Sequence, residues 1–156
     1  MYIKSLKELE PMEKGRIVKV GGQGEIRRRL LDMGVVNGVT VEVLRVAPLG
    51  DPVQIKVKGY DLALRKAEAE NIQIELTEVM LNRAPPGADV VITAVRAGWG
   101  LKRRLADMGL VPGTGVSIIN NARPGPVILE VRGSRLAIGH GVAAKIMVST
   151  AGSAEK

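Results

Sequence analysis

An internal repeat constrains the fold of this chain more than any other feature of its sequence. Residues 27–38 read RRRLLDMGVVNG and residues 102–113 read KRRLADMGLVPG, identical at 8 of 12 positions with an offset of 75. The register extends outward, because Pro11 corresponds to Pro86 and, after one deleted residue, Ile72 corresponds to Ile146. Self-similarity of this kind indicates that the chain holds two copies of one structural unit. With only two long copies, a tandem pair of closed domains is favoured over an open solenoid.

The repeat predicts the division of the chain. The pattern of the first copy ends near Leu76, and the sequence RAPPG at 83–87 carries the glycine and prolines typical of a connection. We therefore expect a first domain at 1–76, a linker at 77–87, a second domain at 88–149 and a flexible tail at 150–156. The second domain is the more divergent copy.

Each copy begins with a predicted strand and a short helix. Residues 15–20 are rich in β-branched side chains and are followed by glycines, which favours a strand. From Glu25 the spacing of Ile26, Leu30 and Met33 places these side chains on one helical face. Gly34 then suits a left-handed helix cap. The second copy repeats this pattern with Leu101, Leu105, Met108 and Gly109.

The rest of each copy predicts short antiparallel strands. Residues 39–46 and 53–57 alternate between apolar and polar side chains on either side of a Pro-Gly turn, as a hairpin does. Residues 65–70 fit one helical turn before a last strand around Ile72. About five short strands with tight connections predict a mainly β, small antiparallel barrel with one short helix in each copy. The predicted core of the first copy, with its counterparts in the second, comprises Ile17, Leu30, Met33, Val41, Val43, Ile55 and Ile72.

The composition removes several classes of function. The chain has no cysteine and a single histidine, His140, so disulfides, thiolate catalysis and Cys-based zinc sites are excluded, and an enzyme is not expected. The first copy, 1–76, carries 13 basic and 11 acidic side chains, and the remainder carries 10 and 5, so the second half holds most of the net charge of +7. No apolar run reaches the length of a membrane span and the first residues lack a signal core. We expect a soluble cytosolic protein.

Three stretches of the first copy together resemble one family. They are IRRRLLDMG at 26–34, the turn APLGDP at 47–52 and GYDLALRKAEAENI at 59–72, and they are similar to the FeoA family, ferrous iron transport protein A. The second copy keeps LKRRLADMG at 101–109, but it has ARPGP at 122–126 in place of the turn and Ile138-Gly139-His140-Gly141 in place of Leu64-Arg65-Lys66-Ala67.

The resemblance implies two tandem SH3-like β-barrels and a cytoplasmic location, with contact at the inner face of the membrane left open. It also implies a non-enzymatic accessory or regulatory role in ferrous iron transport, by contact with the cytosolic part of a FeoB-type permease. Two alternatives stay open: an RNA- or nucleotide-binding SH3-like module, and a metal-responsive regulatory domain. The scarcity of aromatic rings, 2% of residues, opposes specific nucleic-acid binding because single strands are recognised largely by stacking.

The candidate partner-binding residues are basic side chains on the two helices and the tip of the first turn. Arginine pairs well with carboxylates and phosphates, and an apolar residue at a turn tip is a plausible contact. The competing interpretation is a solvated helix face with an arginine paired to Asp32 or Asp107. The candidates are Arg27, Arg28, Arg29, Leu49, Gly50, Asp51, Lys102, Arg103 and Arg104.

The metal-ligating residue types give only weak candidates. Asp32 and Asp107 precede Met-Gly in the two helices, where helix termination and pairing with Arg28 or Arg103 is the simpler interpretation. His140 lies between two glycines, which favours a turn. Because Fe(II) sites usually combine several oxygen and nitrogen ligands, we expect no tightly bound cofactor and at most weak binding of Fe(II) or another divalent metal.

Overall fold

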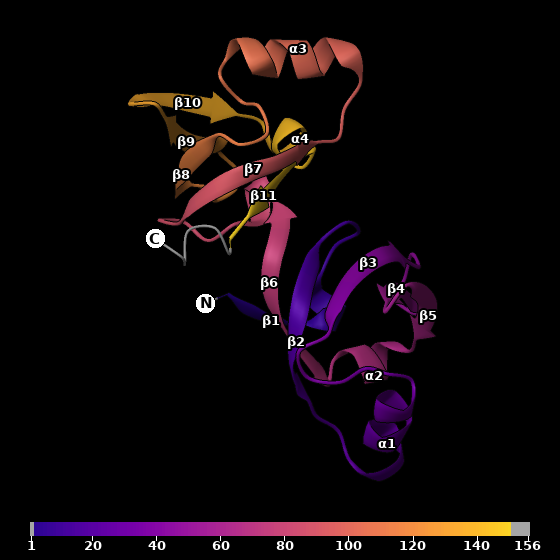
Figure 1. The fold of residues 1–156 in the computed structure, drawn as a ribbon. Coiled ribbons are helices and arrows are strands. Elements are labelled where there is room, and N and C mark those ends of the chain that lie inside the picture. The colour runs from indigo at the N-terminus through magenta and orange to yellow at the C-terminus, as the bar shows by residue number, and fades with distance from the viewer. Residues whose placement is uncertain (1, 151–156) are drawn as a thin grey trace. The chain divides into compact units, whose positions relative to one another are not determined.

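The computed structural model describes residues 2–150, which separate into a first unit ending at Thr77 and a second unit beginning at Glu78 (Figure 1). The expected tail residues 151–156 lie outside the described residues. Both units consist mainly of antiparallel strands, so the predicted mainly β, two-unit fold is confirmed.

The first unit holds β1 (Ile3–Ser5), η1 (Leu6–Glu8), β2 (Lys14–Val20), α1 (Gly24–Asp32), β3 (Thr40–Val46), β4 (Val53–Val57), β5 (Tyr60–Leu64), α2 (Lys66–Ala69) and the first part of β6 (Ile72–Met80). Its strands follow the order β1-β6-β2-β3-β4-β5. The expected strands and the helical turn are present. The sequence patterns did not predict β1, η1 or β5 as separate elements.

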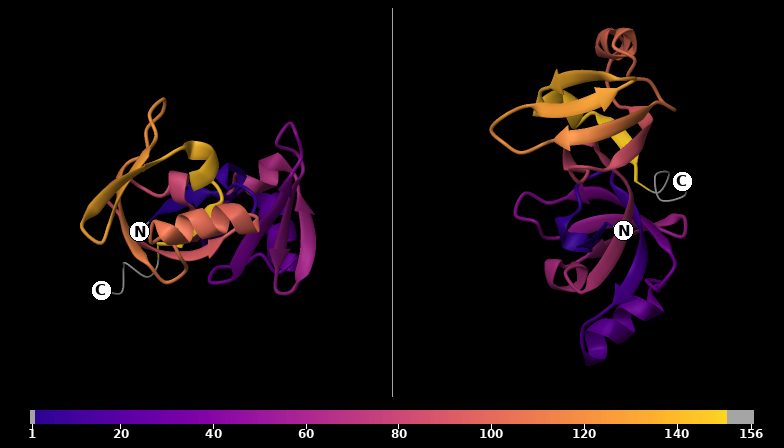
Figure 2. Two further views of the ribbon diagram at one scale, coloured as in Figure 1. Left: turned by 90° about the horizontal axis from the view of Figure 1, so that it is seen from above. Right: turned by 90° about the vertical axis from the view of Figure 1, so that its left-hand side faces the viewer.

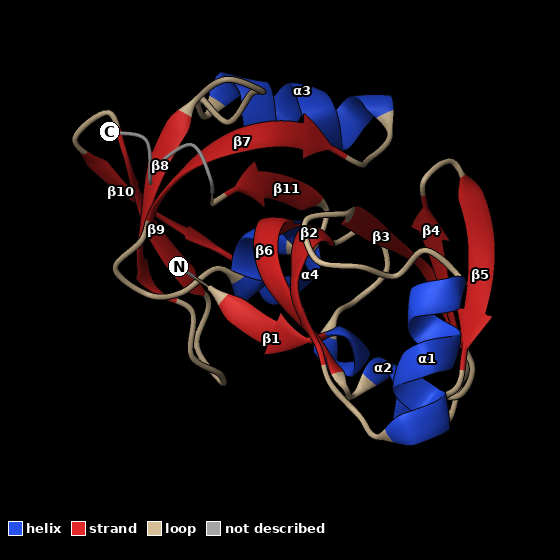
Figure 3. Cartoon of the chain, turned by 60° about the horizontal axis from the view of Figure 1, so that its bottom comes forward, coloured by secondary structure: helices blue, strands red, loops and turns tan. Residues whose placement is uncertain are grey.

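The second unit repeats this plan. It holds the end of β6, η2 (Leu81–Arg83), β7 (Asp89–Val95), α3 (Trp99–Asp107), β8 (Gly115–Asn120), β9 (Val127–Val131), β10 (Ser134–Ile138), α4 (His140–Ala143) and β11 (Ile146–Ser149). Its strands follow the order β6-β11-β7-β8-β9-β10. The strands and helices of the two units can be compared in Figure 3. In each unit the strands curl into an SH3-like barrel that stays open, since β5 and β10 have one strand neighbour each within the described residues.

Strand β6 takes part in both copies of the repeat. Gln73, Ile74 and Glu75 pair with β1, while Glu78, Val79 and Met80 pair with β11. The offset of 75 carries β1 onto Glu78–Met80, so the second part of β6 is the counterpart of β1. Residues 77–87, expected as a linker, therefore contain the end of β6, the short helix η2 and a turn.

The core is aliphatic, as the near absence of aromatic residues requires. Of the predicted core residues, Ile17, Leu30, Val41, Val43, Ile55 and Ile72 are buried. The prediction was wrong for Met33, which is only half-buried, and for its counterpart Met108, which is 41% exposed.

The backbone at the end of α1 explains why Met33 misses the core. The N–H of Val35 donates to the carbonyl of Leu30, and the N–H of Gly34 donates to the carbonyl of Leu31, both at 3.0 Å, which is a Schellman motif. Gly34 has a φ of 87°, which turns the chain back sharply. Val35, fully buried, thereby takes the core position that helical spacing assigned to Met33. Leu110 plays the same part after α3.

Candidate functional site

The three arginines of α1 have different environments, although they are adjacent in the sequence. Arg27 donates from Nε to the carbonyl oxygen of Val20 at 3.3 Å. Arg29 donates from Nη1 to Oε2 of Glu68 at 2.7 Å. Arg28 is exposed and makes no hydrogen bond or ion pair with any residue between 2 and 150. Of the three, Arg28 has the guanidinium most available to a partner.

Glu68 is a residue of this region that sequence reasoning did not identify. Its side chain is 5% exposed and belongs to α2, where Oε1 accepts a hydrogen bond from the backbone N–H of Arg65 at 2.9 Å. The bond to the Arg65 N–H could have been predicted from the sequence, because a glutamate three residues after a helix N-cap commonly accepts a hydrogen bond from the N-cap N–H. The carboxylate therefore fastens α1 to α2 and also caps α2.

The expected pairing of the helix arginines with Asp32 or Asp107 is wrong. Within the described residues neither aspartate makes an ion pair, and both are exposed at the ends of their helices. Arg29 instead reaches Glu68, which is distant in the sequence but belongs to the helix that lies beside α1 (Figure 3). Spacing along one helix could not predict a contact made between two helices.

The turn between β3 and β4 presents an apolar side chain to solvent. Leu49 is 90% exposed, and Gly50 next to it has a φ of 83°. Asp51 accepts, at Oδ1, a hydrogen bond from the backbone N–H of Lys66 at 3.3 Å. This bond ties the turn to the start of α2.

The predicted site residues of the first unit are thus connected through α2. The Arg29–Glu68 hydrogen bond joins α1 to α2, and the Asp51–Lys66 hydrogen bond joins the turn at 47–52 to α2. We call the surface formed by α1, α2 and the turn at 47–52 the α2 face. It carries an available cation, Arg28, and an exposed leucine, Leu49, on elements that are hydrogen-bonded to one another.

The second unit keeps the basic helix but changes its surroundings. The guanidinium of Arg103 lies over the ring of Trp99, 5.4 Å from the centroid, and Trp99 is 74% exposed. Lys102 and Arg104 make no ion pair within the described residues. The repeat places Val142 where the first unit has Glu68, so Arg104 lacks the partner of Arg29. The turn at 122–126, which is one residue shorter than the turn at 47–52, has Arg123 and no leucine.

The weak metal candidates are not brought together with further ligands. Between residues 2 and 150 no group of three or more Asp, Glu or His side chains is placed to hold a metal ion. His140 begins α4, and its Nε2 contacts the carbonyl oxygen of Gly125 at 3.0 Å. One of the two imidazole nitrogens is thereby engaged inside the protein.

None of the helices in the described part of the chain combines the length and the apolar character that crossing a membrane requires.

Comparison with known proteins relates both units to one family. The FeoA domain model matches residues 4–76 and 79–150. The Fe(2+) transport protein A/Fe(2+) transporter FeoB fusion protein of Porphyromonas gingivalis is 38% identical over 85 residues, which cover 54% of this chain and only 10% of the fusion protein. The putative Fe(2+) transport protein A of Methanocaldococcus jannaschii is 43% identical over 68 residues, covering 44% of this chain and 82% of that protein.

A solved structure matches over nearly the whole length. The solution structure of iron(II) transport protein A from Clostridium thermocellum superposes with a TM-score of 0.59 at 30% identity, covering 94% of this chain and 87% of that one. This similarity extends across both copies of the repeat.

Proposed function

Because the chain belongs to the FeoA domain family, we propose that it is an accessory or regulatory protein of ferrous iron transport that acts by contact with a FeoB-type permease. The relative from Porphyromonas gingivalis, whose name joins Fe(2+) transport protein A to the transporter FeoB in one fusion protein, supports this partner. The proposed contact is with the cytosolic part of the permease, so the proposed location is the cytoplasm. The proposed role involves binding and no catalysis.

The observation that carries the proposal is the exposure of Leu49 on a turn that is fastened to α2. An apolar side chain that is 90% exposed at a turn tip has little contact of its own, and burying it against a partner would stabilise a complex. The Asp51–Lys66 hydrogen bond holds the turn, which lowers the ordering cost of binding. On α1, Arg28 supplies a cation that has no ion-pair partner among the described residues.

The three arginines contribute unequally to this contact. Arg27 and Arg29 are engaged with Val20 and Glu68, so changing them alters the unit itself. Arg28 is therefore the residue whose charge can be removed with the least effect on the fold. A charge at the rim of an interface changes the association rate and its salt dependence, whereas an apolar anchor changes dissociation.

The experiment is a surface-binding measurement between the full chain and the purified cytosolic domain of a FeoB-type permease. Arg28→Glu should weaken binding strongly at low salt and little at high salt. Leu49→Asp should weaken it at all salt concentrations, by about tenfold or more. The controls are Arg103→Glu, at the position of the second unit that corresponds to Arg28, and Arg123→Asp, in its turn at 122–126. Both should bind like the parent.

Several outcomes would contradict the proposal. If neither α2-face variant differs from the parent while a second-unit control loses binding, the contact lies in the second unit. Absence of any binding to the permease domain, together with a salt-dependent mobility shift of RNA, would favour the nucleic-acid alternative. A third possible result is binding to an anionic membrane face, because the second unit is the more basic one. Vesicles of anionic lipid, measured in the same instrument, test for it.

A further inference from the structure

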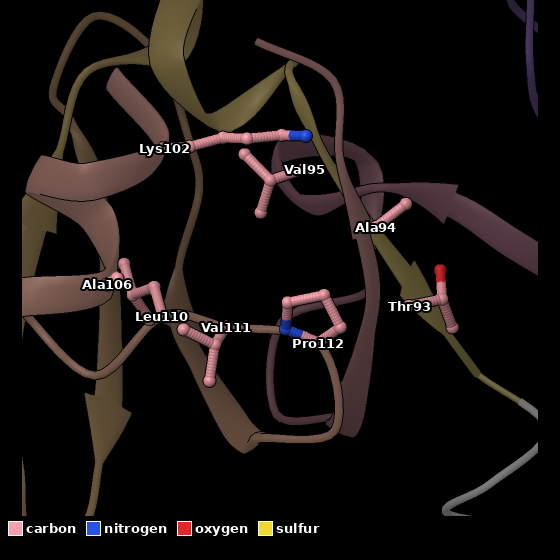
Figure 4. Close-up of a pocket in the computed structure, with 8 residues that line it drawn as sticks. All are labelled: Thr93, Ala94, Val95, Lys102, Ala106, Leu110, Val111 and Pro112. Atoms are coloured by element: carbon pink, nitrogen blue, oxygen red, sulfur yellow. The ribbon is translucent and has the colours of Figure 1, made fainter. Parts of the chain in front are cut away.

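The second unit contains a pocket of about 420 Å³ between α3 and β7 (Figure 4). In Figure 4, Ala106 and Leu110 lie on one side and Ala94 and Thr93 on the other, and Lys102 extends along the top of the view. The remaining lining residues are Val95, Val111 and Pro112. The walls are thus mostly aliphatic, the only charged lining residue is a cation, and the volume falls in the range of ligand pockets.

The pocket exists because α3 stands away from the strands of its unit. In the right-hand view of Figure 2 this helix projects beyond β7 to β10. Only Leu105 of α3 is buried, and Leu110, after the helix, completes the contact with the core. The space along the other face of the helix is left to the pocket.

Two differences between the copies concern the side chains that line this space. The offset of 75 places Leu31 of the first unit where the second has Ala106. The side chain at this position of the pocket wall is therefore smaller in the second unit. It also places Arg27 where the second unit has Lys102. Arg27 donates to the carbonyl of Val20 in the strand, whereas Lys102 makes no such hydrogen bond within the described residues. The first copy thus carries a larger residue and a helix-to-strand bond at these two positions.

The charges on α3 indicate what kind of ligand the pocket suits. Lys102 and Arg104 make no ion pair with any residue from 2 to 150, and Arg103 lies against the Trp99 ring. In the part of the chain that the structure describes, no acidic side chain lines the pocket to neutralise Lys102. A ligand with an aliphatic group beside a carboxylate matches both the walls and the rim.

We propose that this pocket binds a peptide segment of a partner, with an aliphatic side chain inserted between α3 and β7 and a neighbouring carboxylate paired with Lys102. A concave aliphatic site favours a discrete side chain over a lipid surface, because a bilayer presents no protruding group to fill it. The site is separate from the α2 face, and the inference does not depend on the identity of the proposed permease partner.

The test measures the binding of a labelled peptide of alternating aspartate and leucine to the full chain by fluorescence anisotropy. Ala106→Leu restores the residue of the first copy, so the variant should fold, and it should weaken peptide binding about tenfold or more by filling the pocket. Lys102→Ala should weaken binding about threefold, and only at low salt, since the pair is exposed. Gly100→Ala, on the same helix and in open space, is the control and should bind like the parent.

Two further peptides test the ligand chemistry. Replacing leucine by alanine in the peptide should abolish binding, and replacing aspartate by asparagine should remove the dependence on Lys102. The proposal is overturned if the parent does not bind the peptide or if Ala106→Leu binds it unchanged. It is also overturned if phosphatidylglycerol vesicles shift the emission of Trp99, the single tryptophan, while the peptide does not bind, because α3 would then recognise lipid.

Discussion

The imidazole of His140 is joined to Gly125, with 3.0 Å between Nε2 and the carbonyl oxygen. The repeat aligns this pair with Lys66 and Asp51 of the first unit, where the backbone N–H of Lys66 donates to Oδ1 of Asp51. Both units therefore connect the same turn to the same short helix. In the first unit the side chain in this hydrogen bond is that of Asp51 in the turn, and in the second unit it is that of His140 in the helix.

This relationship predicts the tautomer of His140. A carbonyl oxygen only accepts hydrogen bonds, so Nε2 must carry the proton that it donates to Gly125. Nδ1 is buried and has no hydrogen-bond partner among the described residues, so nothing there competes for the proton that Nε2 donates. Nitrogen NMR of the imidazole should therefore show the Nε2–H tautomer in preference to the Nδ1–H tautomer, in a spectrum with one histidine to assign. A predominant Nδ1–H form would contradict the contact.

A variant extends this prediction to the turn. His140→Lys introduces the residue of the first copy without the aspartate that would accept from the helix, so residues 122–126 should lose their connection to α4. Amide hydrogen exchange should become faster in that turn. The corresponding turn at 47–52, which is held by Asp51, serves as the internal control and should exchange at the parent's rate.

Local patterns in the sequence were sufficient to predict most strands, because alternating side chains have one way to bury an apolar face. They also predicted the burial of Ile17 and Leu30. They failed for Met33, because the chain reverses at Gly34 and helical spacing no longer applies beyond the helix end. They could not reveal that β6 belongs to both units, since residues 78–80 are too few to show an alternating strand pattern of their own.

The sequence predicted which residues belong to the candidate site better than it predicted which residues they contact. Arg28 and Leu49 are exposed, as a partner-binding role requires. The bonds that organise them run through Glu68 and Lys66, which are far from α1 in sequence. The pocket beside Lys102 depends on how far α3 stands from β7, a spacing that no side-chain pattern encodes.

Removal of the Glu68 carboxylate should loosen the α2 face in two distinguishable steps. Glu68→Gln keeps an oxygen for the Arg65 N–H but loses the ion pair with Arg29, whose side chain is 51% exposed, so the cost should be under about 1 kcal/mol. Glu68→Ala also leaves that N–H without its acceptor and should cost about 2 kcal/mol. Denaturant unfolding measures both values.

The control for this pair is Glu130→Gln, because the half-buried side chain of Glu130 in β9 makes no hydrogen bond or ion pair within the described residues, and the change should alter stability little. Equal effects of Glu68→Gln and Glu68→Ala would show that the N-cap bond contributes nothing. In that case α2 would be held by the packing of Ala69, which is fully buried, and not by its capping bond.

Gly15 is the glycine at which a methyl group meets the strongest obstruction. A Cβ there would lie 2.2 Å from Cγ2 of Ile74 and 2.6 Å from the backbone oxygen of Glu75, both in β6. The backbone atom cannot move aside without disturbing the pairing of β2 with β6. Gly15→Ala should therefore destabilise the first unit by about 3 kcal/mol or more. Gly139→Ala, where a Cβ meets nothing within 4 Å, is the matched control and should leave stability nearly unchanged. Thermal unfolding of both variants decides the matter: a Gly15→Ala protein as stable as the control would mean that β2 and β6 do not approach each other this closely.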